Sequence, residues 1–175
     1  IQPFQKVFAA FRYNLLDNME LQKLQQTELD KIPHIADENK LEQIYQLVDM
    51  VDIFPQYQKW KKEENWIDYG DMICNLWELI QHNNDVLKAL QTQYKHVLVD
   101  EFQDNNYALS KIVQKIAEPE NSITVVGDDD QCIYAFRQAN IQNVHQFKTR
   151  YYTNKQVPIS LMQNYRSNQS ILNVA

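Results

Sequence analysis

The chain has 175 residues and a mass of 20.9 kDa, which is enough for one domain or two small ones. Hydrophobic residues make up 44% and charged residues 23%, as in ordinary globular proteins, and no apolar run approaches the ~20 residues of a membrane span. The net charge of −6 argues against a general polyanion-binding surface. Cys74 and Cys132 are far apart and form no CxxC pair, which excludes a disulfide framework and makes a reducing cytoplasm the expected location.

Residues 1–93 are predicted to be mainly helical, because apolar residues recur there at spacings of three and four. The clearest stretches are residues 4–15, 41–51 and 72–80. Pro33 and Pro55 are expected to interrupt this pattern, and residues 35–39 to form a loop or linker. This half holds 9 Lys and Arg against 15 Asp and Glu, so it carries all of the net negative charge.

Four aromatic residues, Tyr57, Trp60, Trp66 and Tyr69, lie near the middle of the chain. Such residues can stack nucleic-acid bases, but aromatic residues at helical spacing more often pack in a core. The sequence therefore predicts core positions for them.

From residue 94 onward the pattern changes to short apolar strands. HVLVD at 96–100 and ITVVG at 123–127 are predicted to be buried parallel strands, and VPISLM at 157–162 is a third candidate. The helices expected in this half are residues 107–117, residues 141–151 and a segment from Asn168. This alternation predicts an α/β fold with a doubly wound parallel sheet, in which ligands bind at the carboxyl ends of the strands.

The chain has two glycines, Gly70 and Gly127, where average usage predicts about a dozen. A phosphate-binding GxxxxGK[ST] loop or a GxGxxG turn needs two glycines within a few residues. The given sequence therefore lacks the loop that normally holds the phosphates of a nucleotide.

Acidic residues follow both predicted strands. Asp100 and Glu101 end the first, and Gly127 is followed by three aspartates and Gln131 after the second. Adjacent carboxylates after an apolar strand suit a hydrated Mg²⁺ and an acid that activates water. A solvated acidic turn is the alternative for one such cluster, but two of them in one sheet favour a site.

Two further groups of residues have the chemistry of ligand contacts. Tyr134, Phe136 and Arg137 can stack bases and contact phosphate, or they can pack, and the residue types leave both open. Arg166 in QNYRS suits bidentate phosphate binding.

Three ordered blocks, VLVDEFQD, VVGDDDQCIYAFRQA and LMQNYRS, with WIDYGDMI upstream, resemble motifs II, III and IV of the UvrD/Rep/PcrA group of superfamily 1 DNA helicases. The match covers residues 96–175, and WIDYGDMI extends it to about residue 66. The resemblance implies that residues 1–93 contain a 1B-like accessory subdomain and connecting helices, and that residues 94–175 form part of a RecA-like motor domain (1A). An interior fragment of an ATP-dependent 3′ to 5′ DNA helicase is therefore expected, with single-stranded and duplex DNA as partners.

The resemblance also implies a set of ATP and Mg²⁺ contacts. Asp100 would hold Mg²⁺, Glu101 would orient the attacking water, and Gln131 would sense the γ-phosphate and couple it to the DNA site. Tyr165 would lie against adenine, and Arg166 would act as an arginine finger.

The implied contact with single-stranded DNA falls on Tyr134, Phe136 and Arg137. Phe136 stands where the family often has Trp, Gln138 stands where Gly is usual, and Cys132 replaces the commoner Ser. A Gln at a position usually free of a side chain is a departure from the family pattern that bears on the implied DNA contact.

Two other interpretations remain. One is a non-catalytic interaction module that keeps the motor fold, and a Walker A loop encoded ahead of this segment would exclude it. The other is a metal-dependent nuclease built on Asp100, Glu101, Asp128 and Asp130, which would cleave DNA without ATP. By itself the 175-residue chain is expected not to hydrolyse ATP, because the backbone amides of a phosphate loop are missing.

Overall fold

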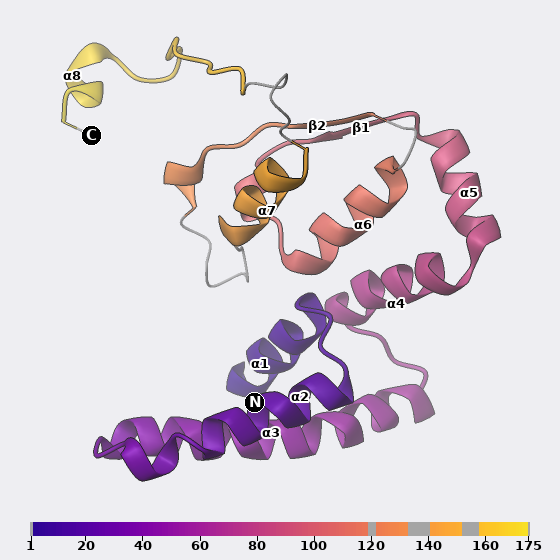
Figure 1. The fold of residues 1–175 in the computed structure, drawn as a ribbon, viewed down its shortest axis with the longest axis vertical. Helices are drawn as coiled ribbons and strands as arrows, with labels where there is room; N and C mark the ends of the chain where they lie inside the picture. Colours follow the sequence, from indigo (N-terminus) through magenta and orange to yellow (C-terminus); the bar gives the residue numbers. More distant parts are fainter. Residues whose placement is uncertain (1, 119–121, 133–140, 152–157, 175) are drawn as a thin grey trace. The chain divides into compact units, whose positions relative to one another are not determined.

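The computed structural model describes residues 2–118, 122–132, 141–151 and 158–174 (Figure 1). It contains two compact units, Ile1–Val144 and His145–Ala175. The elements of the first unit are α1 (Gln2–Tyr13), α2 (Asn18–Leu29), η1 (Ile32–His34), α3 (Glu38–Glu63), α4 (Tyr69–His82), α5 (Asn84–Gln93), β1 (His96–Val99), η2 (Phe102–Asp104), α6 (Tyr107–Ala117), β2 (Ser122–Val125) and η3 (Asp129–Gln131). Helix α7 (Ile141–Tyr151) begins at the end of the first unit, and α8 (Gln169–Leu172) lies in the second.

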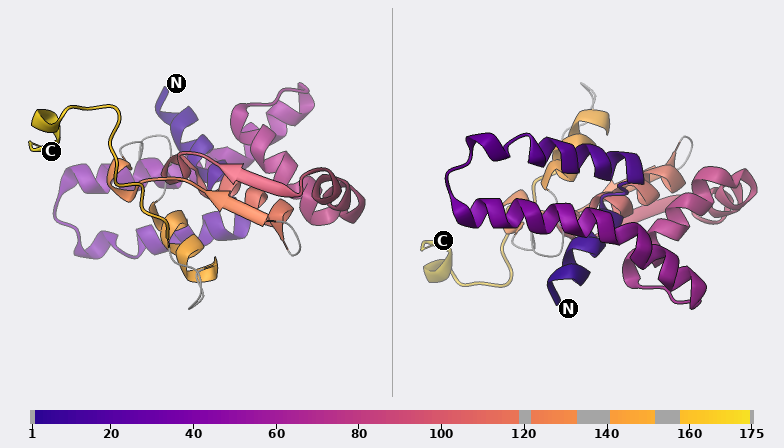
Figure 2. Two further views of the ribbon diagram at one scale, coloured as in Figure 1. Left: turned by 90° about the horizontal axis from the view of Figure 1, so that it is seen from above. Right: turned by 90° about the horizontal axis from the view of Figure 1, so that it is seen from below.

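The apolar core of the helical half forms where α1 and α2 pack on α3. Helix α2 lies alongside α3 (Figure 2). Phe8 and Phe11 of α1 contact Phe54 of α3, with ring centroids 5.2 and 5.3 Å apart, and Leu21, Met50 and Val51 complete the buried cluster. Aromatic pairs at these separations add to the stabilisation from their buried area. The core therefore ties the α2–α3 hairpin to the first helix.

Pro55 does not interrupt the helical pattern as predicted, because α3 runs through it from Glu38 to Glu63. A proline inside a helix removes one backbone hydrogen bond and crowds the preceding turn. Here the buried side chains of Val51 and Phe54 anchor the same stretch of helix in the core, and this packing outweighs the local cost. Pro33 lies in η1 between α2 and α3, as the predicted break requires.

Two helices that the apolar pattern did not predict, α2 and α5, begin at clear capping residues. Asp17 caps α2 through a capping box with Glu20, and Asn83 caps α5 by accepting the N–H groups of Asp85 and Val86. Asp37 caps α3 in the same way. The loop expected at residues 35–39 therefore ends at Asp37, and the helix begins at Glu38.

The predicted α/β arrangement is confirmed: a helical first half precedes a parallel sheet. Strands β1 and β2 pair in parallel, from His96 opposite Ser122 to Val99 opposite Val125. Helix α6, which has the predicted bounds, connects them and packs on both strands. Helix α7 also has the predicted bounds.

The strands are not buried on both faces as predicted. Their residues alternate between exposed and half-buried, and Leu98 is 77% exposed. Val97 and Val99 share the covered face, because successive side chains of a strand point to opposite sides. Among the described elements α6 packs on both strands, and the sheet keeps one open face.

The third predicted strand is wrong for the residues that the structure describes. Residues 158–162 have no strand structure, and Ile159, Leu161 and Met162 are exposed. An apolar run becomes a strand only when a neighbouring strand accepts its backbone hydrogen bonds. The helix expected from Asn168 is α8, which Asn168 caps, but it ends at Leu172 instead of continuing.

None of the helices in the described ranges has the length and apolar character needed to cross a membrane. The predicted boundary between an accessory region and a motor region near residue 93 stays a prediction.

Candidate active site at the carboxyl ends of β1 and β2

The two acidic turns predicted from the sequence begin at the same edge of the sheet. Because β1 and β2 are parallel and Val99 pairs with Val125, the chain leaves both strands side by side. Backbone bonds continue the pairing beyond the strands: the Val126 N–H donates to Val99 O over 2.8 Å, and the Phe102 N–H donates to Val126 O over 2.9 Å. The strand ends are thus joined by the backbone.

The turn after β1 places Glu101 in an unusual backbone conformation. Its φ of 48° and ψ of 47° are left-handed, a region that costs a non-glycine residue about 1 kcal/mol or more. Asp100 Oδ1 accepts the Glu101 N–H over 3.0 Å, and the buried ring of Phe102 anchors the turn. The carboxylates of Asp100 and Glu101 are therefore exposed at the strand edge while the backbone behind them is held.

A side chain that sequence reasoning did not single out, Gln103, bridges the two turns. It is 2% exposed, its Nε2 donates to Glu101 Oε2 over 2.7 Å, and its Oε1 accepts the Asp128 N–H over 3.1 Å. A Cβ on Gly127 would lie 2.6 Å from that same Oε1. Gly127 therefore has a steric reason to be glycine. The sequence signal for this contact was the position of Gly127 directly after an apolar strand.

The turn after β2 is closed by the carboxylate of Asp128. Its Oδ1 accepts the Asp130 N–H over 3.0 Å, and its Oδ2 accepts the Gln131 side-chain amide over 2.7 Å. Hydrogen bonds thus run without a gap from Glu101 through Gln103 and Asp128 to Gln131. Asp104, in the same turn as Gln103, has a buried Oδ1 without a hydrogen-bond partner among the described residues.

The carboxylates at this edge suit a metal ion whose other ligands are mainly phosphate oxygens and water molecules. Within the described residues no three His, Cys, Asp or Glu side chains come together as metal ligands. Mg²⁺ typically uses one or two carboxylates together with phosphate oxygens and water, so the exposed carboxylate of Asp100 suffices for that role.

The other predicted site residues belong to the second unit or lie outside the described residues. Tyr165 and Arg166 belong to the second unit, where Tyr165 is 92% exposed. Asn164 Oδ1 accepts the N–H groups of Arg166 and Ser167, each over 2.8 Å, and so fixes the turn that carries Arg166. Tyr134, Phe136, Arg137 and Gln138 lie outside the described residues.

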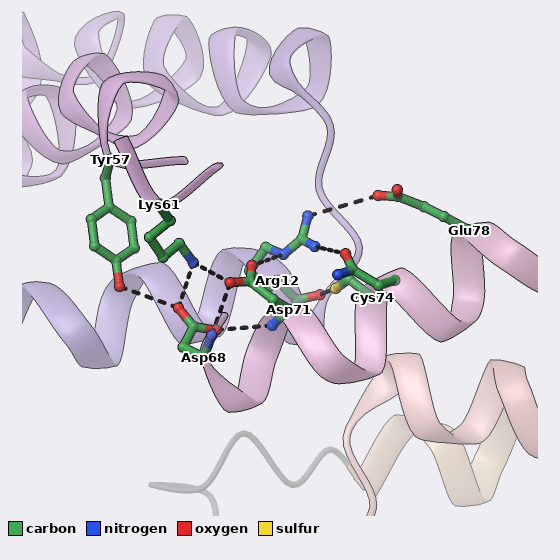
Figure 3. Close-up of polar contacts among 8 residues, drawn as sticks. Arg12, Tyr57, Lys61, Asp68, Asp71, Cys74 and Glu78 are labelled. Carbon is green, nitrogen blue, oxygen red and sulfur yellow. Dashed lines mark hydrogen bonds and ion pairs between the residues drawn. The ribbon is translucent and has the colours of Figure 1, made fainter. Parts of the chain in front are cut away.

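The WIDYGDMI segment takes part in a buried charge cluster formed by Arg12, Lys61, Asp68 and Asp71 (Figure 3). Lys61 is 4% exposed, and its Nζ lies 2.6 Å from Asp68 Oδ2 and 2.5 Å from Asp71 Oδ2. Arg12 Nε lies 3.3 Å from Asp71 Oδ1, within ion-pair range but without hydrogen-bond geometry. Asp68 and Asp71 also form the capping box that starts α4. The cluster thus joins α1, α3 and α4.

These contacts shift the pKa values of Lys61 and Asp68. Burial opposes the charge of Lys61, but the hydrogen bonds that Lys61 donates to Asp68 and Asp71 outweigh it and raise the Lys61 pKa above its usual 10.5. Burial likewise opposes ionisation of Asp68, yet the hydrogen bond from Lys61 and the Asp71 N–H lower the Asp68 pKa below 3.8. Nearby, burial raises the pKa of the Cys74 thiol to about 11, against the opposing effect of Arg12. Lys61 and Asp68 therefore form an ion pair at neutral pH that joins α3 to the start of α4.

The prediction that the aromatic residues near the middle of the chain belong to the core is wrong for three of the four. Tyr57 packs partly against the core, but Trp60, Trp66 and Tyr69 are 46%, 58% and 81% exposed. The rings of Trp60 and Trp66 meet edge to face with centroids 5.1 Å apart. Helical spacing indicates that residues share a face, but it does not say which face is covered.

Comparison with known proteins assigns the family. Residues 4–152 match the UvrD/REP helicase N-terminal domain, so the chain belongs to that family. It is 35% identical over 127 residues to DNA helicase II of Haemophilus influenzae, 38% over 126 residues to ATP-dependent DNA helicase PcrA of Leuconostoc citreum, and 35% over 130 residues to ATP-dependent DNA helicase UvrD1 of Mycobacterium bovis. These alignments cover 70 to 73% of this chain and 17% of each relative. The resemblance seen in the sequence is confirmed.

Proposed function

We propose that the chain is part of an ATP-dependent 3′ to 5′ DNA helicase and contributes residues of its first motor domain that act on Mg²⁺-ATP. The observation that carries the proposal is the joined pair of strand ends, where Glu101 and Gln131 are linked through Gln103 and Asp128. The family and its helicase relatives support it. Because the chain spans 17% of those relatives, the activity belongs to the complete protein.

In this proposal each residue at the strand edge has one task. Glu101 accepts a hydrogen bond from the attacking water and orients it toward the γ-phosphate. Asp100 holds the Mg²⁺ that accompanies ATP, and this ion offsets charge on the phosphate oxygens. Gln131 donates its amide to the γ-phosphate, and Asp128 holds that amide in place beforehand.

The remaining assignments follow the same proposal. Tyr165 stacks against adenine, and Arg166 stabilises charge on the phosphoryl group during transfer. Tyr134, Phe136 and Arg137 contact single-stranded DNA, and duplex DNA is separated ahead of them. We place this activity in the cytoplasm, in keeping with Cys74 and Cys132 being free thiols.

The test compares two carboxylate substitutions in the full-length protein. Glu101→Gln should lower DNA-stimulated ATP turnover about 10²- to 10⁴-fold while ATP still binds, because only the water-orienting group is lost. Asp100→Asn should weaken binding of Mg²⁺-ATP itself. Glu63→Gln, an exposed acid of α3, serves as the control.

Three results would count against the proposal. Equal loss of ATP binding and turnover in Glu101→Gln would assign Glu101 a structural role. A wild-type protein that cleaves DNA with Mg²⁺ and without ATP would indicate the nuclease. A full-length protein that has no ATP turnover would indicate the non-catalytic module.

A further inference from the structure

We propose that Gln103 is a positioning residue that holds Glu101 in its water-orienting geometry and couples it to Gln131. This inference rests on the proposed function. Gln103 is 2% exposed although its side chain is polar. A buried amide is stabilised only when its donor and acceptor both find partners.

The chemistry of the two partners determines which way the Gln103 amide faces. A carboxylate such as that of Glu101 accepts hydrogen bonds, and the backbone N–H of Asp128 donates one. Rotating the amide by half a turn would set an oxygen against a carboxylate oxygen and an NH₂ group against an N–H. Both bonds would be lost together, so the observed orientation is strongly preferred. The amide therefore holds one carboxylate oxygen of Glu101 and leaves the other for water.

Gly127 makes room for this arrangement. A Cβ at position 127 would lie 2.6 Å from Gln103 Oε1 and 3.3 Å from the Phe102 backbone N. Gly127 has no left-handed φ that would otherwise require glycine. The close approach of the β2 turn to the Gln103 side chain is thus the feature that a side chain here would destroy.

The same amide connects Glu101 to the second turn. Asp128 donates its N–H to Gln103 and accepts the Gln131 amide with its carboxylate, so a shift of this turn on nucleotide binding displaces a partner of Gln103. This displacement is transmitted to Glu101 through the Gln103 side chain. Occupancy at Gln131 and the orientation of Glu101 are coupled by this route.

The decisive variant is Gln103→Met in the full-length protein, because Met keeps the length and apolar volume of Gln but can neither donate to Glu101 nor accept from Asp128 as the amide does. We expect kcat for DNA-stimulated ATP hydrolysis to fall about 10- to 100-fold, the scale for a misplaced catalytic group. The KM for ATP and the affinity for single-stranded DNA should change less than about threefold. Gln114→Met, at a buried glutamine of α6, is the matched control and should keep kcat within about twofold.

A second variant, together with melting temperatures, distinguishes a positioning effect on kcat from a loss of folding. Gln103→Glu keeps an oxygen for the Asp128 N–H but places another oxygen against Glu101, so it should lower kcat at least as much as Gln103→Met. Melting temperatures of all three variants are measured beside wild type. In a Glu101→Gln background, Gln103→Met should lower the residual turnover less than twofold, because it acts through Glu101.

The outcomes separate this inference from the proposed function. If wild type hydrolyses ATP and Gln103→Met retains the kcat of Gln114→Met, the positioning role is wrong and the proposed function stands. An equal loss of kcat in the Glu101→Gln background would also overturn it. If wild type shows no ATP turnover, the proposed function fails and this inference fails with it.

Discussion

Gly127 and Gln103 lie so close that the space for a Cβ on Gly127 is already occupied by the Gln103 side chain. The shortest distance from that Cβ would be 2.6 Å, to Gln103 Oε1, and a backbone atom, Phe102 N, would follow at 3.3 Å. The Gln103 side chain could move away only by giving up its bonds to Glu101 and Asp128. The Gln103 amide thus fills the space between the two turns.

The first prediction concerns Gly127→Ala. The added methyl group should lower stability by about 1 to 3 kcal/mol, as overpacking does, and should lower ATP turnover because Gln103 is displaced. Urea unfolding and DNA-stimulated ATPase of the full-length protein measure the two effects. Gly70→Ala is the comparison, since a Cβ there would lie 3.1 Å from Arg12 Cβ and 3.2 Å from Asp68 Oδ1, a milder approach than 2.6 Å, and Ala also has the higher helix propensity. Similar effects at both positions would contradict the steric argument.

The second prediction concerns the buried charge cluster. Lys61→Met should lower the free energy of unfolding by about 3 kcal/mol, because removing one partner of a buried pair leaves uncompensated carboxylates. The expectation lies at the low end of the usual range because Arg12 still faces Asp71 and the Asp68 side chain is 40% exposed. Urea unfolding gives the value.

The control for Lys61→Met is a lysine on the same helix. Lys59 lies 3.8 Å from Glu63 with both side chains exposed, so Lys59→Met should cost less than about 0.5 kcal/mol. Equal losses for the two variants would mean that the buried cluster contributes no more than a surface pair.

The third prediction is a pH dependence of the same cluster. The Asp68 pKa lies below 3.8 in the folded protein, so its contribution is complete above that pH and is lost as pH falls through the lowered pKa. The Lys61 pKa lies above 10.5, so its contribution is complete below that pH and is lost as pH rises through the raised pKa. The difference in melting temperature between wild type and Lys61→Met should therefore be constant near neutral pH and narrow below about pH 3.8. A difference that stays constant into acid would contradict the shift of Asp68.

Local patterns predicted the elements whose determinants are local. The bounds of α6 follow from its apolar period and from Asn106, whose side chain accepts the Leu109 N–H at its start. The parallel pairing of β1 and β2 follows from the helix between them, and it brings Asp100 and Asp128 to one edge. These features needed no knowledge of the rest of the fold.

Features that depend on which surfaces meet could not be read from the sequence. The contact of Gln103 with Asp128 joins two turns and depends on the register of the strands. Trp60 and Phe54 lie on the same helix, yet Phe54 meets α1 while Trp60 is exposed. Lys61 is buried because its partners are Asp68, the N-cap of α4, and Asp71 in its first turn. In each case the deciding neighbour lies on another element.

The last prediction concerns Arg166, whose backbone turn is held by Asn164 while its side chain is exposed. If Arg166 acts only at the surface, Arg166→Ala costs at most about 1 kcal/mol of stability and leaves turnover unchanged. If it acts as an arginine finger, Arg166→Ala in the full-length protein should lower ATP turnover by roughly 10³- to 10⁵-fold without lowering the melting temperature. Arg166→Lys should be nearly as damaging, because an ammonium keeps the charge but loses the planar fork that binds two phosphate oxygens. Arg150→Ala, at an exposed arginine of α7, is the matched control. ATPase within about threefold of wild type in Arg166→Ala, which is less than about 1 kcal/mol of barrier height, would reject the finger assignment.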